Sequence, residues 1–280
     1  MRALVIGLGL LIVTGGCGSD DNDADGGGGT ASGGKTSSGG KTSTAGKTST
    51  GTAGKTSSGA PTTSGDTFGD AHEGVYHLGP VDFAETQWHN ACAPAGKYRS
   101  ALQSSAGLSG EYLAGVANAY NGNGGVCDSC ILIETGKGKS IVARVVTYGV
   151  EMADGDIDVS PAVYDAIYQN EFPRNQTWHF ARCPDVGPIQ YEFQTEANIY
   201  WTSLWVRNPR VPLVKAEVKK SGASDFVELA RGTDGTLTDA SGFGDGAFTL
   251  RLTAMDGQVI SDDLPGFKPG ELVKSTKQFE

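Results

Sequence analysis

Short segments that alternate apolar and polar residues, each ended by a turn, constrain the fold of this chain more than any other feature. After Gly187 they recur at 189–193, 200–206, 214–218, 226–231, 248–253 and 258–261. A period of two is that of a half-buried β-strand. The pairs Ser221-Gly222, Asp234-Gly235 and Asp256-Gly257 between the segments are typical of hairpin turns. Residues 187–280 are therefore predicted to form a β-sandwich of immunoglobulin-like size.

Residues 71–186 also contain short β-rich segments separated by glycine, at 130–134, 141–147 and 177–181. One helix is predicted at Ser160–Asn170, with Ser160 as its N-cap and Pro161 in its first turn. Pro184 to Pro188 marks the boundary between the two parts. The fold class predicted from these patterns is mainly β, with two β domains and one short helix.

The N-terminus has the pattern of an export signal. Arg2 precedes an apolar run, residues 3–13, which is too short to span a bilayer permanently. The following Thr14–Cys17 segment (TGGC) resembles a bacterial lipobox. Residues 1–17 are therefore predicted to be a lipoprotein-type signal peptide with Cys17 as the lipidation site, and simple secretion is the alternative. Gly18 after the cysteine favours the outer membrane, and membrane contact is expected only through this anchor.

Residues 18–70 carry almost no apolar side chains, and GKTS recurs at Gly34, Gly40, Gly46 and Gly54. Such a segment cannot offset the entropy of ordering, so we predict a disordered tether. One stretch, residues 29–36 (GTASGGKT), matches the phosphate-loop pattern. That loop needs a buried strand before it and a helix after it, and neither is present in the sequence. No nucleotide cofactor is expected.

Charge and cysteine usage exclude several classes of function. The net charge is −10 without a basic stripe, so nucleic acid is not an expected partner. Apart from Cys17, the cysteines are an even set that predicts two disulfides in an exported protein: Cys92, Cys127, Cys130 and Cys183. Zinc binding or redox chemistry at the CDSC segment is the alternative. The histidines show no metal spacing, and no metal is expected.

Two indoles are predicted to share one face of a strand. In an extended segment Trp201, Ser203 and Trp205 point to one side, while Leu204 and Val206 point to the core. The indoles would lie about 13 Å apart. Aromatic rings stack on the apolar faces of sugars, at about 1–2 kcal/mol per ring. The alternative is that the indoles are half-buried sheet residues.

Two carboxylates precede the predicted helix. Asp156 and Asp158 in GDIDVS are two residues apart, so in an extended segment both point to one face. Paired carboxylates carry out acid–base chemistry in glycosidases. The alternative is that one of them caps or solvates the turn that leads into Ser160.

Several segments together resemble bacterial expansins. Residues 155–167 (GDIDVSPAVYDAI) resemble the GDIDLSPxAF segment of that family, and HEG at 72–74 resembles the opening of its barrel. Residues 121–130 (NGNGGVCDSC), 200–208 (YWTSLWVRN), 212–218 (PLVKAEV) and 250–257 (LRLTAMDG) continue the likeness. The resemblance implies a six-stranded double-psi β-barrel over 71–186 and a family-63 carbohydrate-binding module over 187–280. It also implies a monomer that loosens cellulose or related β-1,4-glucan without hydrolysis, with peptidoglycan as a further candidate partner.

The resemblance also assigns roles in a barrel groove. Asp158 is the acid that matches the family, and His77 and Thr147 stand where relatives carry Thr and Asp. Gly149 replaces a tyrosine, with Tyr148 adjacent, and Asp156 is a further groove candidate. Because the acid pair is incomplete, the chain is not expected to be an enzyme. The alternatives are a weak glycan-cleaving enzyme that uses Asp158, or a surface polysaccharide-binding adhesin.

In the predicted binding module, the paired aromatics of the family match Tyr200 and Trp201. The position of a third aromatic is occupied by Gly235, and Trp205 is expected to take its role. The disulfide pattern of plant relatives implies the pairs Cys92–Cys127 and Cys130–Cys183. Together these assignments place the protein outside the cytoplasm, at the cell surface or secreted.

Overall fold

The computed structural model describes residues 66–79, 91–92, 112–117, 124–149, 152–184 and 187–280. The signal peptide with Cys17, the phosphate-loop-like stretch and nearly all of the predicted tether lie outside the described residues. Within the described part of the chain, no helix is both long and apolar enough to cross a membrane.

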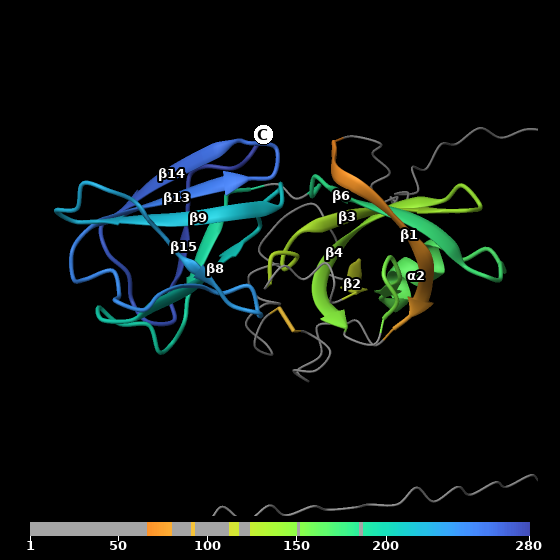
Figure 1. Cartoon of the computed structure of the whole chain (residues 1–280), viewed down its shortest axis with the longest axis horizontal. Helices are drawn as coiled ribbons and strands as arrows, with labels where there is room; N and C mark the ends of the chain where they lie inside the picture. The colour runs from red at the N-terminus through yellow and green to blue at the C-terminus, as the bar shows by residue number, and fades with distance from the viewer. Residues whose placement is uncertain (1–65, 80–90, 93–111, 118–123, 150–151, 185–186) are drawn as a thin grey trace, which may run out of the picture. The chain divides into compact units, whose positions relative to one another are not determined.

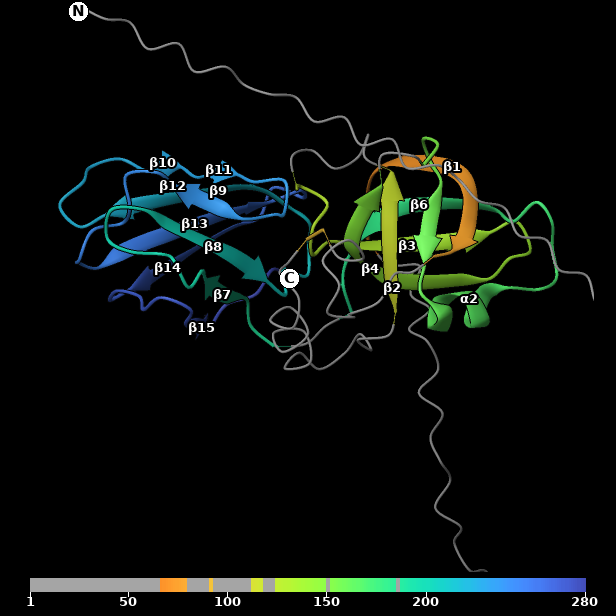
Figure 2. The ribbon, with the colours of Figure 1, turned by 90° about the horizontal axis from the view of Figure 1, so that it is seen from below.

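Six strands close into a barrel in the order β1-β5-β2-β4-β3-β6 (Figures 1 and 2). The pairs β1–β5 and β2–β4 are parallel, and the other pairs are antiparallel. Alternate side chains fill the interior, among them Tyr76, Val116, Ile157 and Trp178. The strands are β1 (Thr67–Leu78), β2 (Leu113–Ala117), β3 (Cys130–Thr135), β4 (Ser140–Gly149), β5 (Ile157–Val159) and β6 (Asn175–Ala181).

Strand β1 begins at Thr67, inside the segment predicted to be a disordered tether. Thr67 and Phe68 pair with Ala181 and Phe180 of β6, so sheet hydrogen bonds and one aromatic ring order these residues. The tether prediction was based on the scarcity of apolar side chains, and a single phenylalanine does not alter that average.

The single described helix, α2 (Pro161–Ile167), is shorter than predicted. Its side chains Val163 and Ile167 pack into the barrel core. Tyr168 has extended backbone angles and ends the helix. Ser160 is the N-cap residue, as predicted, and has extended backbone angles. Its side chain forms no capping hydrogen bond and instead accepts one from the Leu113 N–H at 3.2 Å.

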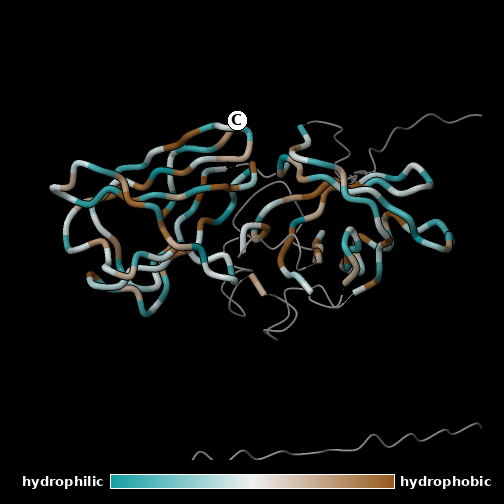
Figure 3. Tube along the Cα trace, in the orientation of Figure 1, coloured by the Kyte–Doolittle hydropathy of each residue, from teal (hydrophilic) through white to brown (hydrophobic). Residues whose placement is uncertain are grey.

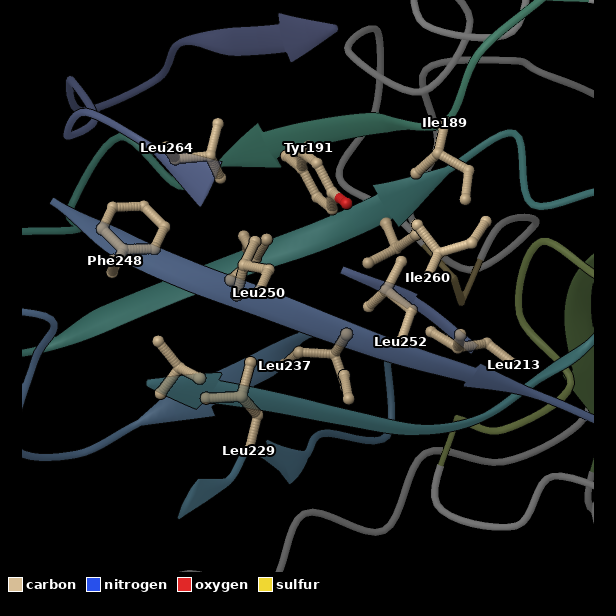
Figure 4. Close-up of a cluster of buried hydrophobic side chains, with 14 of the residues drawn as sticks. Ile189, Tyr191, Leu213, Leu229, Leu237, Phe248, Leu250, Leu252, Ile260 and Leu264 are labelled. Carbon is tan, nitrogen blue, oxygen red and sulfur yellow. The ribbon is translucent and has the colours of Figure 1, made fainter. Parts of the chain in front are cut away.

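The C-terminal part consists of two sheets, with strand orders β10-β9-β13-β14 and β11-β12-β8-β7-β15. Apolar side chains of both sheets meet in one core, where Tyr191 and Leu237 face Leu250 and Leu252 (Figure 4). The strands are β7 (Gln190–Phe193), β8 (Thr202–Arg207), β9 (Leu213–Lys220), β10 (Val227–Glu228), β11 (Ala230–Arg231), β12 (Leu237–Asp239), β13 (Phe248–Ala254), β14 (Val259–Leu264) and β15 (Leu272–Lys274).

The mainly β class is confirmed, with a closed six-stranded barrel and one short helix among the residues that the structure describes. Hydrophobic colour is concentrated in the strands, and the connecting turns are mostly hydrophilic (Figure 3). The single strand predicted over 226–231 is wrong: β10 and β11 belong to different sheets, and the buried Leu229 lies between them. The double-psi and immunoglobulin-like topologies stay predictions.

Candidate functional site

Four residues form a row across the outer surface of the barrel. His77 on β1 is paired with Asp158 on β5, which is paired with Gly115 on β2, which is paired with Thr147 on β4. At about 4.8 Å between strands, the row spans about 14 Å. The neighbouring row of Tyr76, Ile157, Val116 and Tyr148 packs against the barrel core. We call the outward-facing residues His77, Asp158, Gly115 and Thr147 the acid row.

A β-bulge decides which residue of β4 joins the acid row. Ala114 pairs with Val145, but Gly115 pairs with Thr147, so one extra residue is inserted in β4. The bulge reverses the alternation, turning Thr147 outward and Tyr148 toward the core. Of the two residues predicted to line the groove, Tyr148 is partly buried against the barrel core, whereas Thr147 lies in the acid row.

Gly115 allows the side chains of the acid row to pack closely together. A Cβ atom at this position would lie 2.7 Å from Cγ2 of Thr147 and 3.7 Å from Cβ of Asp158. Only glycine therefore fits between these side chains without a shift. Sequence analysis missed Gly115, and the LAGVA segment offers no signal beyond a glycine inside a strand-like run.

Asp156, the residue just before β5, lies next to the acid row. Its Oδ1 accepts a hydrogen bond from the Val75 N–H at 2.9 Å, and its Oδ2 lies 3.5 Å from Nε2 of His77. This contact becomes an ion pair when the histidine is protonated. The side chain of His77 is 44% exposed, so it can also meet a ligand.

The environment of Asp158 disfavours its charged form. Burial raises the pKa of its carboxyl, the imidazole of His77 opposes that rise, and the negative charge of Asp156 adds to it. The carboxylate accepts hydrogen bonds, and the protonated form that this environment favours can also donate one. The site therefore combines a tunable acid, an imidazole and a hydroxyl along one row.

Both predicted disulfides are present, and one of them lies beside the acid row. Cys92–Cys127 ties residues 91–92 to the turn before β3, and the Ala91 N–H donates to Oγ1 of Thr147 at 3.3 Å. Cys130–Cys183 joins β3 to the segment after β6. The zinc and free redox-pair alternatives are wrong for these cysteines, because each sulfur is bonded to another sulfur.

A second cluster is formed by the aromatic turn, residues 198–201. Oδ1 of Asn198 accepts hydrogen bonds from the N–H groups of Tyr200 at 2.9 Å and Trp201 at 3.1 Å. The turn leaves Tyr200 76% exposed and Trp201 partly exposed. Strand β8 starts at Thr202, two residues later than the predicted start at Tyr200. A tight turn, and not a flat strand, presents the rings.

A glycine loop, residues 242–244, supports the aromatic turn. A Cβ at Gly242 would lie 2.2 Å from the carbonyl oxygen of Ile199, which also accepts a hydrogen bond from the Gly244 N–H at 3.1 Å. The Phe243 N–H donates to Oγ1 of Thr202 at 3.0 Å. This role of the glycine loop and that of Asn198 were not predicted from the sequence.

The prediction that Trp205 stands on the open face is wrong. Its side chain is buried, with 3% of the residue exposed, and its Nε1 donates to the Asp234 carbonyl at 3.1 Å. The guanidinium of Arg207 lies 4.9 Å from the ring centre. Of the three rings predicted to form the binding surface, only Tyr200 and Trp201 are accessible to solvent. Leu204 and Val206 do point into the core, as predicted.

The chain is similar in sequence and in fold to known expansins. No protein-family model matches the chain. Over 138 residues, 49% of its length, the chain is 27% identical to Expansin-YoaJ of Bacillus subtilis (strain 168) and spans 58% of that relative. The chain therefore spans little more than half the length of this curated relative.

Two solved structures have the same fold. The apo expansin of Clavibacter michiganensis superposes with a TM-score of 0.57 at 17% identity, over 75% of this chain and 98% of the other. A point mutant of the same expansin, in complex with cellohexaose, superposes with a TM-score of 0.59 at 16% identity and the same coverage.

Proposed function

We propose that this expansin-like protein binds β-1,4-glucan, such as cellulose, through its aromatic turn and acid row, and loosens packed glucan chains without hydrolysing them. The observation that carries the proposal is the aromatic turn, in which Tyr200 is held in solvent by a rigid hydrogen-bonded support. An aromatic ring held in water contributes nothing to the core, and it is ready to cover an apolar surface.

Sugar rings offer such a surface on their C–H faces. Covering one ring contributes about 1–2 kcal/mol, which corresponds to about five- to thirty-fold in affinity. Because Asn198 fixes the turn, little further ordering is needed when Tyr200 and Trp201 meet a glycan. The aromatic turn thus supports adsorption to a flat polysaccharide surface.

The acid row supplies the polar half of the contact. Asp158, His77 and Thr147 carry hydrogen-bonding groups that match the hydroxyls of a glucan chain. The solved expansin in complex with cellohexaose, an oligomer of β-1,4-linked glucose, supports glucan as the ligand class.

Loosening without hydrolysis is favoured by the side chain across the row from Asp158. Thr147 stands there, about two strand spacings or 10 Å away, and its hydroxyl cannot act as the second carboxyl group of a hydrolase. Binding that competes with glucan–glucan hydrogen bonds needs no covalent step.

The test is retention on insoluble cellulose together with wall-extension measurements. The double variant Tyr200→Ala with Trp201→Ala is expected to lose most retention, whereas Phe172→Leu should keep it. Phe172 is the matched control because it is 91% exposed and lies outside both clusters. Unchanged retention of the double variant contradicts the proposal. Retention without wall extension favours the adhesin alternative.

A specific observation favours a weak glycan-cleaving activity as a second candidate. Asp156 and Asp158 lie two residues apart beside His77, and the charge of Asp156 adds to the rise in the pKa of Asp158. Inverting glycosidases use such a pair, one carboxyl as acid and the other as base. The raised pKa of Asp158 suits a general acid, while Asp156 can act as the base. New reducing ends from β-glucan or peptidoglycan that disappear in Asp158→Asn and in Asp156→Asn would establish it, and their absence with the unsubstituted protein excludes it.

Export is part of the proposal. Two disulfides among the described residues suit an oxidising compartment outside the cytoplasm. A lipid anchor at Cys17 would hold the domains at the cell surface by a long tether. Incorporation of labelled fatty acid that is lost in Cys17→Ala tests the anchor, and a protein found only in the medium without label contradicts it.

A further inference from the structure

A cavity of about 310 Å³ lies at one edge of the C-terminal sandwich, where the chain crosses from β10 in one sheet to β11 in the other. We call it the edge cavity. It is lined by residues 214–216 of β9, residues 228–231 of the crossing and Leu237 of β12. Small-ligand sites span about 300–1,000 Å³, so a cavity of this size fits a single sugar ring and not a long chain.

Arg231 extends its side chain into the space between the two sheets. It is paired with Leu237, so the two side chains share a face of their sheet, and Leu237 belongs to the sandwich core (Figure 4). Across this space, Nη2 of Arg231 donates to the Leu213 carbonyl of β9 at 2.9 Å. The guanidinium therefore lies in the wall of the edge cavity, beside Val214.

The charge of Arg231 is withdrawn from water without a close counter-ion. A guanidinium has more N–H donors than the single bond to Leu213 uses. Among the described residues it has no other hydrogen bond, and no carboxylate lies within ion-pair distance. Burial lowers the pKa of Arg231. Because taking a cation out of water is unfavourable unless an anion compensates it, this geometry indicates an anionic ligand.

The nearest negative charge, that of Glu228, lies on the other face of the strand. Glu228 pairs with Glu217, which stands between two core residues of β9 and so points to the outer face of its sheet. Its charge opposes the fall in the pKa of Arg231 from a distance. Lys215 also lines the edge cavity, but its Nζ is ion-paired with Glu217 at 2.8 Å.

Val214 gives the edge cavity an apolar wall. Thr253 pairs with Lys215 and Ala254 pairs with Leu213, so Val214 is the extra residue of a β-bulge in β9. It is 52% exposed, although it lies within a strand beside the core. An uncompensated cation and an exposed branched side chain thus stand next to each other.

This combination selects one class of anion. The planar guanidinium fork matches a carboxylate, with which it forms two parallel hydrogen bonds. A doubly charged phosphate would be repelled more strongly by Glu228 than a carboxylate with a single charge. A simple carboxylate would leave Val214 uncovered, whereas a sugar acid has both a carboxylate and an apolar C–H face.

We propose that the edge cavity is a binding site for an acidic sugar, in which Arg231 binds the carboxylate of a uronic acid residue and Val214 packs against its ring. The ligand class is a polysaccharide that contains uronic acids. This site goes beyond the proposed glucan binding, since it shares no residue with the acid row or the aromatic turn.

Calorimetric titration of the protein with two matched trisaccharides tests the proposal. One contains a single glucuronic acid residue, and the other is its methyl ester, which has the same ring without the charge. The acid is expected to bind about three- to fifteen-fold more tightly, between the effect of an exposed ion pair and that of a hydrogen bond to a charged group. The preference should shrink as salt rises. Equal binding of acid and ester overturns the proposal, as does displacement of the acid by acetate or inorganic phosphate at equal concentration.

Three variants assign the preference to Arg231. Arg231→Gln keeps an N–H donor for the Leu213 carbonyl but removes the charge, so acid and ester should bind equally. Glu228→Gln removes the opposing charge and should strengthen binding of the acid. Lys274→Gln removes a positive charge from an exposed position of β15 outside the cavity and should change nothing.

A preference that survives Arg231→Gln, or that Lys274→Gln lowers as much, overturns the proposal. Glu228→Gln keeps the test decisive if Arg231→Gln fails to fold, because Glu228 is exposed and lies outside the core. Weaker or unchanged binding of the acid by Glu228→Gln then contradicts the site.

The outcome is separate from the test of glucan binding. Tyr200→Ala with Trp201→Ala should lower cellulose retention and leave the preference for the acid unchanged. If retention is unaffected while the preference holds, the glucan proposal is wrong and the edge cavity stands. The opposite pattern removes the edge cavity alone.

Discussion

Substituting Gly115 tests the geometry on which the acid row depends. The methyl group of Gly115→Ala would lie 2.7 Å from Cγ2 of Thr147, which is closer than carbon atoms can approach. Overpacking of this kind costs about 1–3 kcal/mol. For a folded region of about 200 residues, 1 kcal/mol lowers the melting temperature by about 2–4 °C. The variant is therefore expected to melt about 2–12 °C lower in a calorimetric scan.

A second substitution identifies the cause. Thr147→Ser removes Cγ2 and keeps the hydroxyl that accepts from the Ala91 N–H. Alone it should cost less than about 1 kcal/mol, the value of one partly buried methyl group. Combined with Gly115→Ala it should restore most of the loss, because the clash is gone and alanine restricts the unfolded chain. The coupling between the two sites is expected to be at least about 1 kcal/mol.

Gly136→Ala is the matched control. Its added methyl would meet Asn175 at 3.8 Å, which is ordinary contact, so its melting temperature should change little. If Gly115→Ala melts like the unsubstituted protein, or if Thr147→Ser fails to rescue it, then the bulge in β4 does not bring Thr147 against Gly115. The acid row as described would then be refuted.

Three further predictions concern single contacts. Trp205→Ala should destabilise the protein by about 3–5 kcal/mol because it empties a buried site, and denaturant titration that finds a change below about 1 kcal/mol contradicts its burial. Because the raised pKa of Asp158 means that the folded protein binds its proton more tightly, stability should fall as pH rises through and above 3.8, the carboxyl's ordinary value. Melting scans across pH should show that Asp158→Asn removes this fall in stability. If the slope of melting temperature against pH is unchanged in the variant, Asp158 does not cause the fall. Cys130→Ala with Cys183→Ala opens a loop of 53 residues and should lower the free energy of unfolding by about 4 kcal/mol in the chain-entropy model. An unchanged midpoint of denaturant unfolding would show that the bond is dispensable.

The aromatic residues show why sequence could predict a surface but not its extent. Alternation correctly put Trp205 on the side of β8 opposite Leu204, since side-chain direction is a local property of an extended chain. Whether that side faces water depends on what covers it. Here the Arg207 guanidinium, from the same strand, lies over the ring, and the Asp234 carbonyl accepts from its Nε1. The contact with Asp234 depends on how the chain returns to β8.

Local chemistry, readable in the sequence, determined much of this protein. The period of two specified the strands, the GDIDVS segment brought Asp156 and Asp158 to one side, and the cysteine pattern of relatives gave both disulfides. Tertiary structure alone decided the acid row, because a bulge in β4 and the pairing of strands distant in sequence set which residues become neighbours. A one-residue shift in register moves every following side chain to the other face, and no local pattern in the chain specifies that shift.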